Sequence, residues 1–205
     1  GLGTGIIQSL GVIPAFGLTE PTLKYYKEVL TRPDLLQSLK YSMYIAFMSA
    51  FLATVTGTFL CAVLVSAGKV RGIIMRIVQI PIIVPHVVVA LFIVNILSQN
   101  GILARILANA GLITDQQQFP ILIYDRYGFG VILAYLWKEI PFIIYFVIAL
   151  MANINGSLGE AATNLGANKL QTFMKVTLPL CMNTVLSGFL IIFVFALGAY
   201  ELPFI

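Results

Sequence analysis

The sequence predicts an all-α protein, a polytopic bundle of transmembrane helices. Hydrophobic residues make up 60% of the 205-residue chain and charged residues only 10%, whereas a soluble domain carries about 25% charged residues. The mean hydropathy is +0.98, and apolar stretches of about 20 residues, the length that crosses a bilayer, recur along the chain. These observations exclude a soluble globular domain and make the lipid bilayer the expected surroundings.

We expect residues 1–205 to form a single transmembrane domain that is truncated at both ends. Residues 1–18 are apolar, rich in glycine and interrupted by Pro14, which indicates the end of a span that begins upstream. Residues 19–40 carry too many charges for lipid and predict an extramembrane segment. Four predicted spans then follow, at 41–67, 77–98, 129–152 and 180–200.

The connections between these spans differ in character. Residues 68–76 form a short basic turn, and the span after it contains Pro81 and Pro85, where we expect a kink. Residues 99–128 form a longer polar connection, in which apolar residues of 102–110 recur at helical spacing. That spacing predicts a short helix lying at the membrane interface.

The distribution of Lys and Arg gives a first indication of orientation, because cytoplasmic loops are enriched in both residues. The connection 154–178 must lie on the same side of the membrane as 68–76, while 19–40 and 99–128 lie on the other. If 68–76 is cytoplasmic, the inner connections contain five Lys or Arg residues and the outer ones six. The inner connections are denser in positive charge, but the count by itself leaves both orientations open.

The charge and cysteine content exclude other classes of protein. The net charge is +4 and the pI about 9.1, yet the cations are spread over several loops and form no stripe for nucleic acid. The two cysteines, Cys61 and Cys181, stand in apolar surroundings without a CxxC or Cys/His cluster. Neither a metal site nor a disulfide framework is indicated, and both cysteines are expected to be small core residues.

The segment 154–178 is predicted to form a helix–turn–helix between two spans. Ser157 followed by Glu160 is a capping-box pattern, so a short helix is expected to begin there. Gly166 suits the left-handed position that ends such a helix. An ordinary loop with capped helices is the alternative interpretation.

A second helix is predicted directly after this turn. Asn168 followed by Gln171 repeats the start signal, and Pro179 suits the first turn of the next helix. Ala161 and Ala162 leave one surface of the first helix small, so that a partner could approach closely.

These residues stand at the spacing of the EAA loop of ABC importer permeases, so the sequence resembles that family. The loop reads E-A-A, three residues, G, nine residues, I, one residue, L-P, and this chain departs from it only in having Val where Ile is favoured. The runs 195–204 and 81–86 also look like the spermidine/putrescine-type branch. The matching residues are Glu160, Ala161, Ala162, Gly166, Val176, Leu178 and Pro179.

The resemblance implies the fold of a type I ABC importer permease, of whose six spans this chain holds about five. It implies that 154–178 is the cytoplasmic coupling loop, which docks on an ATPase subunit, and hence that 68–76 is also cytoplasmic. The implied partners are ABC ATPase subunits, a second permease that is the same or homologous, an extracytoplasmic substrate-binding protein and the bacterial inner membrane. ATP and Mg are expected on the ATPase, since this chain has no G-x-x-x-x-G-K-[ST] motif. The chain itself is expected to be a transport subunit without a cofactor, not an enzyme.

Charged residues within the spans are the candidates for a translocation path. Lys138 and Glu139 lie near the centre of the span 129–152, where a charge costs at least about 2.5–3.5 kcal/mol on insertion scales. Neighbours on a helix point in different directions, so separate partners are expected, for Glu139 the hydroxyl of Tyr135. Satisfied contacts between helices are the alternative to a role in the path.

Two further polar residues complete the candidate path. His86 shares a predicted helix face with Gln79, and a packing role is the alternative for this single histidine. Glu201 lies at the outer end of the last apolar run, where it could contact the substrate or the binding protein, or be a solvated rim residue.

The leading hypothesis is therefore the permease of an ATP-driven importer for a small solute. The alternative is a secondary transporter or channel-like carrier without an ATPase, which inverted repeats would favour, and the sequence has no recognisable internal repeat. An intramembrane enzyme would need a cluster of His, acidic or Cys residues, which one His and scattered carboxylates do not supply. Nothing in the sequence identifies the cargo.

Overall fold

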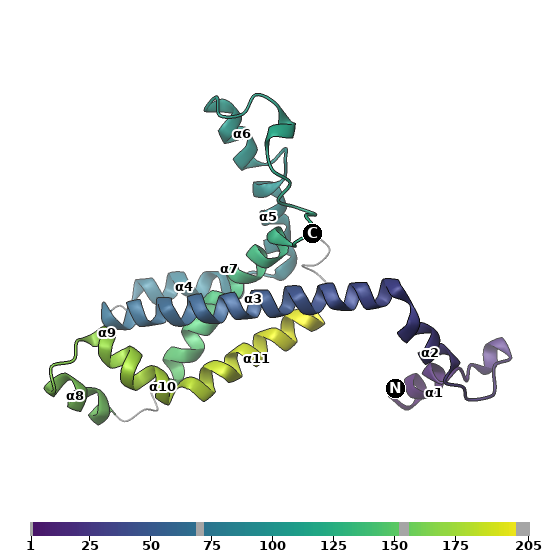
Figure 1. Ribbon diagram of the computed structural model, residues 1–205, viewed down its shortest axis with the longest axis horizontal. Helices are drawn as coiled ribbons and strands as arrows, with labels where there is room; N and C mark the ends of the chain where they lie inside the picture. Colours follow the sequence, from purple (N-terminus) through teal and green to yellow (C-terminus); the bar gives the residue numbers. More distant parts are fainter. Residues whose placement is uncertain (1, 69–71, 152–155, 200–205) are drawn as a thin grey trace. The chain divides into compact units, whose positions relative to one another are not determined.

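The computed structural model describes residues 2–68, 72–151 and 156–199 of the chain (Figure 1). Helices and loops make up these residues, apart from one isolated β-bridge between Ile13 and Leu18. The predicted all-α class is confirmed. The structure comprises two compact units, Gly1–Tyr44 and Ile45–Ile205.

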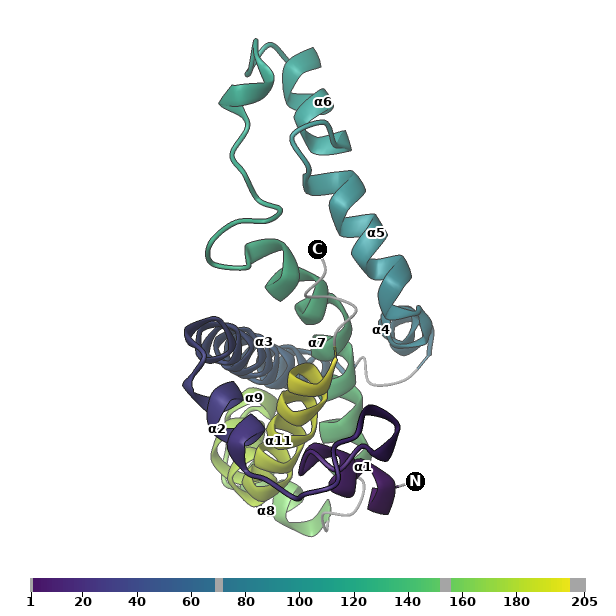
Figure 2. The ribbon, with the colours of Figure 1, turned by 90° about the vertical axis from the view of Figure 1, so that its right-hand side faces the viewer.

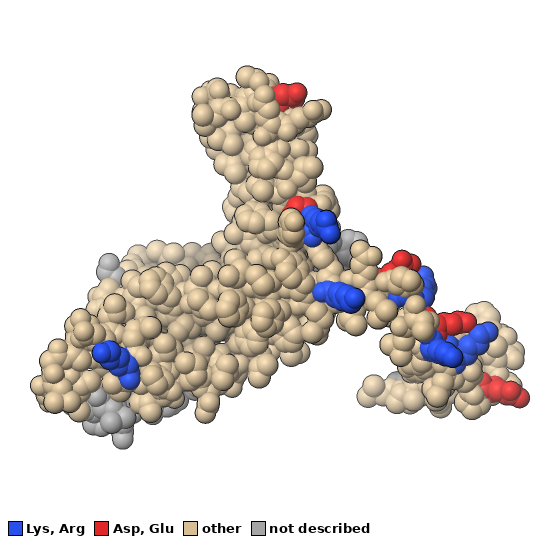
Figure 3. Space-filling view, in the orientation of Figure 1, with Lys and Arg blue, Asp and Glu red and all other residues tan. Residues whose placement is uncertain are grey.

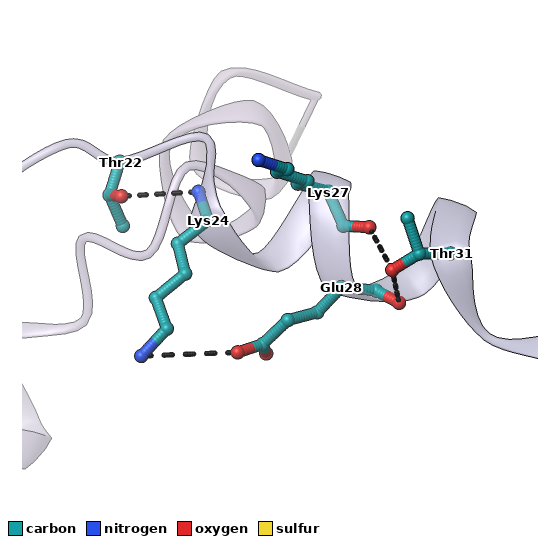
Figure 4. A network of polar contacts seen from close by, with 5 residues as sticks. All are labelled: Thr22, Lys24, Lys27, Glu28 and Thr31. Carbon is teal, nitrogen blue, oxygen red and sulfur yellow. Dashed lines mark hydrogen bonds and ion pairs between the residues drawn. The ribbon is translucent and has the colours of Figure 1, made fainter.

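The N-terminal unit contains short, exposed helices. Ser9 and Tyr26 share a hydrogen bond of 2.6 Å between their hydroxyl oxygens. A polar network (Figure 4) includes an exposed ion pair of 3.9 Å between Lys24 Nζ and Glu28 Oε1, and exposed pairs of this kind contribute little to stability. The helices are α1 (Leu2–Ser9), η1 (Pro14–Phe16) and α2 (Lys24–Thr31).

The helix α3 spans Pro33–Ser66 and begins earlier than the predicted span 41–67. Proline suits the first turn of a helix because the missing N–H is unpaired there in any case. Arg32, which ends α2, is extended with φ −72° and ψ 122°, since the residue before a proline avoids the helical region. Part of the polar segment 19–40 is therefore helical.

The predicted span 77–98 is two helices, α4 (Ile73–Ile83) and α5 (His86–Leu97). The break lies at Val84, which is extended with φ −68° and ψ 130° because Pro85 follows it. Pro81 stays inside α4. Figure 2 shows α6 (Ile102–Asn109) following α5, and His86–Asn109 together is long and apolar enough to cross a membrane. The end of α5 at Leu97 agrees with the predicted end of the span at 98, and α6 is the short helix predicted within the connection 99–128.

The helix α7 (Phe129–Met151) packs against α4, α5 and α11 (Met182–Gly198). These bounds agree closely with the predicted spans 129–152 and 180–200. The helix α3 approaches α7 at Gly57, where an added Cβ would lie 2.8 Å from the Cβ of Ile143. Gly188 of α11 lies against the same isoleucine. Small residues on both neighbours thus let three helices meet at one side chain.

The buried residues of the unit Ile45–Ile205 form two clusters, and most of its large apolar side chains elsewhere are exposed. In Figure 3 most of the surface over α3 and α11 is uncharged. Such a surface suits lipid or apolar partner subunits. The first cluster includes Val89, Ile93, Ala134, Tyr135 and Ala196. The second includes Cys61, Ala62, Ile143, Val147, Phe173 and Ile192.

Candidate functional sites: the connecting helices and a cavity at a broken helix

The segment after α7 is a helix–turn–helix, as predicted. The first helix, α8 (Gly156–Asn164), contains the E-A-A residues. Ala161 is exposed and Ala162 half-buried, while the side chain of Glu160 lies outside the described part. The helix begins at Gly156, one residue before the predicted start at Ser157, and the side chain of Ser157 lies outside the described part, so its predicted capping role stays a prediction.

The turn after α8 is a Schellman motif centred on Gly166. This glycine has φ +87°, the left-handed conformation that the sequence predicted. The amide of Ala167 donates to the carbonyl of Ala162 at 3.0 Å, and the amide of Gly166 donates to that of Thr163 at 2.9 Å. These are the two hydrogen bonds of the motif. Leu165, next to the turn, is 90% exposed.

The second helix, α9 (Lys169–Thr172), begins with the predicted capping box. Asn168 Oδ1 accepts from the amide of Gln171 at 2.8 Å, and Gln171 Oε1 accepts from the amide of Asn168 at 3.0 Å. Two amides that a helix start leaves unpaired are thereby satisfied.

The chain continues through the π-helical segment η3 (Phe173–Thr177) and α10 (Leu178–Leu180). Phe173 is 1% exposed and belongs to the same buried cluster as Cys61 of α3. Val176 and Leu178 are half-buried, and Pro179 lies in the first turn of α10, as predicted. The chain then bends by 71° into α11. The helix–turn–helix thus leads into α11 through this bend, and Phe173 joins it to the buried cluster that includes residues of α3.

Both cysteines are buried and free. This agrees with the prediction that they are small core residues.

A second site lies at the break between α4 and α5. A cavity of about 220 Å³ is bounded by residues of these helices, α7 and α11. Three of the four predicted path residues line this cavity, while Glu201 lies outside the described residues. The polar lining residues are His86, Lys138 and Glu139, and the apolar ones are Ile82, Phe142, Ile191, Ile192 and Phe195.

Lys138 bridges α7 to the break. Its Nζ donates a hydrogen bond to the carbonyl oxygen of Val84, the residue that ends α4. Carbonyls at the end of a helix lack partners within it, and a cation there also interacts favourably with the helix dipole. The prediction of separate partners for Lys138 and Glu139 therefore holds for the lysine.

Glu139 is 5% exposed, and neither of its carboxylate oxygens has a hydrogen-bond partner among the described residues. The expected bond from Tyr135 is absent, because that hydroxyl donates to the carbonyl of Ala196 at 3.2 Å instead. The hydroxyl of Tyr135 thus binds a backbone carbonyl of α11 instead of the carboxylate of Glu139. The predicted pairing was therefore wrong.

His86 occupies the first turn of α5, with its ring centroid 5.1 Å from that of Phe195. Gln79 is exposed on α4. The expectation that the two share a face was wrong, because the break at Val84 interrupts the helical repeat between them.

Two features were not expected from the sequence. Leu165 is exposed to solvent directly before Gly166. Its position before a predicted left-handed glycine is a signal in the sequence from which this exposure could have been predicted. The hydroxyl of Tyr145 donates to the carbonyl of Met75 at 2.6 Å, a second link from α7 to α4. No pattern in the sequence signals that bond, since 70 residues separate its partners.

The comparisons with known proteins agree with this architecture. The profile of the family described as binding-protein-dependent transport system inner membrane component matches residues 53–203. The chain belongs to this family. The predicted resemblance to ABC importer permeases is confirmed at this level.

Individual permeases of the family are similar over most of the chain. The sulfate transport system permease protein CysT of Salmonella typhimurium is 26% identical over 185 residues, which cover 89% of this chain and 63% of that protein. The putrescine transport system permease protein PotI of Escherichia coli is 27% identical over 176 residues, which cover 85% of this chain and 57% of that protein. The chain thus spans about three-fifths of the length of these permeases.

A solved structure shows the same fold. A chain in the crystal structure of a bacterial ABC transporter for import of the acidic polysaccharide alginate superimposes with a TM-score of 0.66 at 21% identity. The match covers 93% of this chain and 70% of that one. The polyamine permease stands beside sulfate permeases among the relatives, so similarity does not single out one cargo.

Proposed function

We propose that this chain is a permease subunit of an ATP-driven ABC importer in the bacterial inner membrane. It forms part of the path for a small solute that an external binding protein delivers. Its partners are ABC ATPase subunits and a second permease, the same or homologous. The observation that carries the proposal is the pair of helices α8 and α9, joined by a Schellman turn at Gly166. The residues of this pair stand at the spacing of the EAA loop, in a chain whose residues 53–203 match the permease family.

In this proposal, α8 and the turn after it dock on the ATPase. The exposed Ala161 lets the partner approach closely, and the side chain of Leu165 fills an apolar pocket of the partner. Phe173 packs against α3, and α10 leads into α11. A movement of the ATPase would therefore reach two membrane helices through rigid elements. In this proposal, 154–178, and with it 68–76, lies on the cytoplasmic side.

In the membrane, Lys138, Glu139 and His86 contribute the polar wall of the path, and Glu201 contributes at its outer end. The alternative of a carrier without an ATPase makes an opposite prediction for energy coupling. Uptake by such a carrier would follow an ion gradient in vesicles depleted of ATP, whereas uptake by an importer would stop.

The docking proposal is tested by replacing Leu165 with Asp and following co-purification of the ATPase subunit. A buried charge without a partner opposes docking, so we expect the ATPase to be lost and uptake to fall. Leu112→Asp is the matched control. Leu112 is also exposed, at 70%, but it lies in the connection 99–128, on the side of the membrane opposite the proposed docking loop. Normal ATPase retention and normal uptake with Leu165→Asp would refute the docking assignment.

A further inference from the structure

The helix α2 of the N-terminal unit has two chemically different faces. Successive residues of a helix are rotated by about 100°, and this rotation places all the polar residues of α2 on one side and all the apolar ones on the other. The polar face consists of Lys24, Lys27, Glu28 and Thr31 (Figure 4). The apolar face consists of Tyr25, Tyr26, Val29 and Leu30.

The N-terminal unit itself covers only part of the apolar face. The hydroxyl of Tyr26 shares a hydrogen bond of 2.6 Å with that of Ser9 in α1. The ring of Tyr25 lies so close to Gly11 that a Cβ added to this glycine would be 2.7 Å from Tyr25 Cε2. The two tyrosines therefore hold α2 to the segment before it, while Leu30 remains 63% exposed.

The connection to α3 keeps α2 close to the bilayer. A single residue, Arg32, separates the two helices. The uncharged run of α3 begins at Tyr41, and the eight helical residues before it, 33–40, extend about 12 Å at 1.5 Å each. The headgroup layer on each side of the hydrocarbon core is itself about 5–7 Å thick. The helix α2 is therefore tethered within reach of the lipid headgroups.

The charges of α2 suit the same surroundings. Lys24 and Lys27 are exposed, and Glu28 is the single acidic residue of the helix. The ion pair between Lys24 and Glu28 is long, at 3.9 Å, with side chains that are 73% and 58% exposed, so it leaves the lysine accessible. Helices that lie in a membrane interface carry Lys or Arg on the polar face and aromatic residues or Leu on the other. The lysines thus complement the negative phosphates of a lipid surface.

We propose that α2 lies in the interface of the phospholipid bilayer, at the leaflet where α3 begins. Val29 and Leu30 insert at the boundary between the headgroups and the acyl chains. Lys24 and Lys27 extend toward the phosphate groups, because a lysine can lay its alkyl stem along apolar surroundings and keep its ammonium group in the polar layer.

The two tyrosines fit this placement. Tyrosine is enriched at the level of the headgroups, where an apolar ring and a polar hydroxyl are both accommodated. This role goes beyond transport of a solute. It gives the chain a second attachment to the bilayer directly before Pro33, where α3 begins, and so fixes the direction from which the chain enters that span.

The test measures which solvent surrounds position 30. The permease complex is placed in nanodiscs of equimolar phosphatidylcholine and phosphatidylglycerol, with plain or brominated acyl chains. Trp137 is the only tryptophan of the chain, so Leu30→Trp is introduced together with Trp137→Phe. Glu28→Trp in the same background is the matched control, because positions 28 and 30 lie on opposite faces of α2.

Brominated lipid should quench the tryptophan at position 30 at least about twofold more strongly than the one at position 28, because the apolar face of such a helix lies about 5–10 Å deep in the boundary. Aqueous iodide should quench the two in the reverse order. If the complex does not assemble without Trp137, the difference in emission between each variant that retains Trp137 and the unmodified complex gives the same comparison.

Two outcomes would overturn the inference. Quenching of position 30 by iodide but not by brominated lipid would place α2 in water. Protection of position 30 from both quenchers would mean that protein, and not lipid, covers the apolar face. Uptake and retention of the ATPase are measured separately on the unmodified complex, so neither outcome bears on the proposal that the chain is an importer permease.

Discussion

Lys138, in the middle of α7, donates a hydrogen bond to the main-chain carbonyl of Val84, the residue at which α4 ends. The bond joins a charged side chain to a helix break 54 residues away in the sequence. The bond gives the lysine an acceptor within an apolar span, and it gives the carbonyl of Val84 at the helix break a donor. Ile82 and His86, which stand on either side of this break, line the cavity that also contains Lys138 and Glu139.

Replacing Lys138 with Met should destabilise the permease, because the Val84 carbonyl loses its donor. The expected loss is about 1–3 kcal/mol, measured as a lower Tm of the purified protein in detergent. Lys24→Met is the control, since the Lys24 side chain is 73% exposed in a weak ion pair. Equal Tm values for the two variants would show that the bond to Val84 contributes nothing.

Gly57→Ala should lower the Tm despite the better helix propensity of alanine. The added Cβ would lie 2.8 Å from the Cβ of Ile143 and 3.1 Å from the carbonyl oxygen of Ile140, so α3 and α7 must move apart. Overpacking of this kind costs about 1–3 kcal/mol. Gly198→Ala has nothing within 4 Å of the new Cβ and should leave the Tm unchanged or raise it. A higher Tm for Gly57→Ala would contradict the close approach of the two helices.

Gly166→Ala should impair coupling without a steric clash. No atom lies within 4 Å of an added Cβ, but the φ of +87° is strained for any residue with a side chain, at about 1–2 kcal/mol. Stimulation of the ATPase by loaded binding protein in reconstituted vesicles should therefore fall in Gly166→Ala and in Gly166→Asp. Gly159→Ala in α8 is the matched control, because its Cβ would meet only Thr172 Cγ2 at 3.9 Å. Full stimulation in the Gly166 variants would argue that the turn has no part in coupling.

The proposed orientation predicts a difference in labelling between two exposed positions. Single cysteines at Gly72 and Gln117, in a background without Cys61 and Cys181, should react differently with an impermeant maleimide added to spheroplasts. Position 117 should be labelled, and position 72 should be labelled only after the membrane is opened. Labelling of position 72 in closed spheroplasts would invert the topology and remove the basis for a cytoplasmic coupling loop.

The sequence by itself determined the features that depend on local chemistry. The apolar run of 129–152 is sufficient to define α7, because the bilayer length and the absence of water select a helix. Gly166 and the pair Asn168–Gln171 specify their turn and cap through bonds within a few residues. The same holds for the break predicted at Pro85, because proline acts on the residue before it. The kink expected at Pro81 is not a break, since this residue stays inside α4.

Only the tertiary structure decided which polar groups meet within the membrane. Lys138 donates to a backbone carbonyl of a distant helix, and the hydroxyl of Tyr135 donates to Ala196 on α11. Within the described residues, Glu139 has no hydrogen-bond partner. Side-chain type and spacing within one helix do not encode these choices. They depend on how closely α4, α5 and α11 approach α7, and that distance is set by packing at small residues such as Gly188.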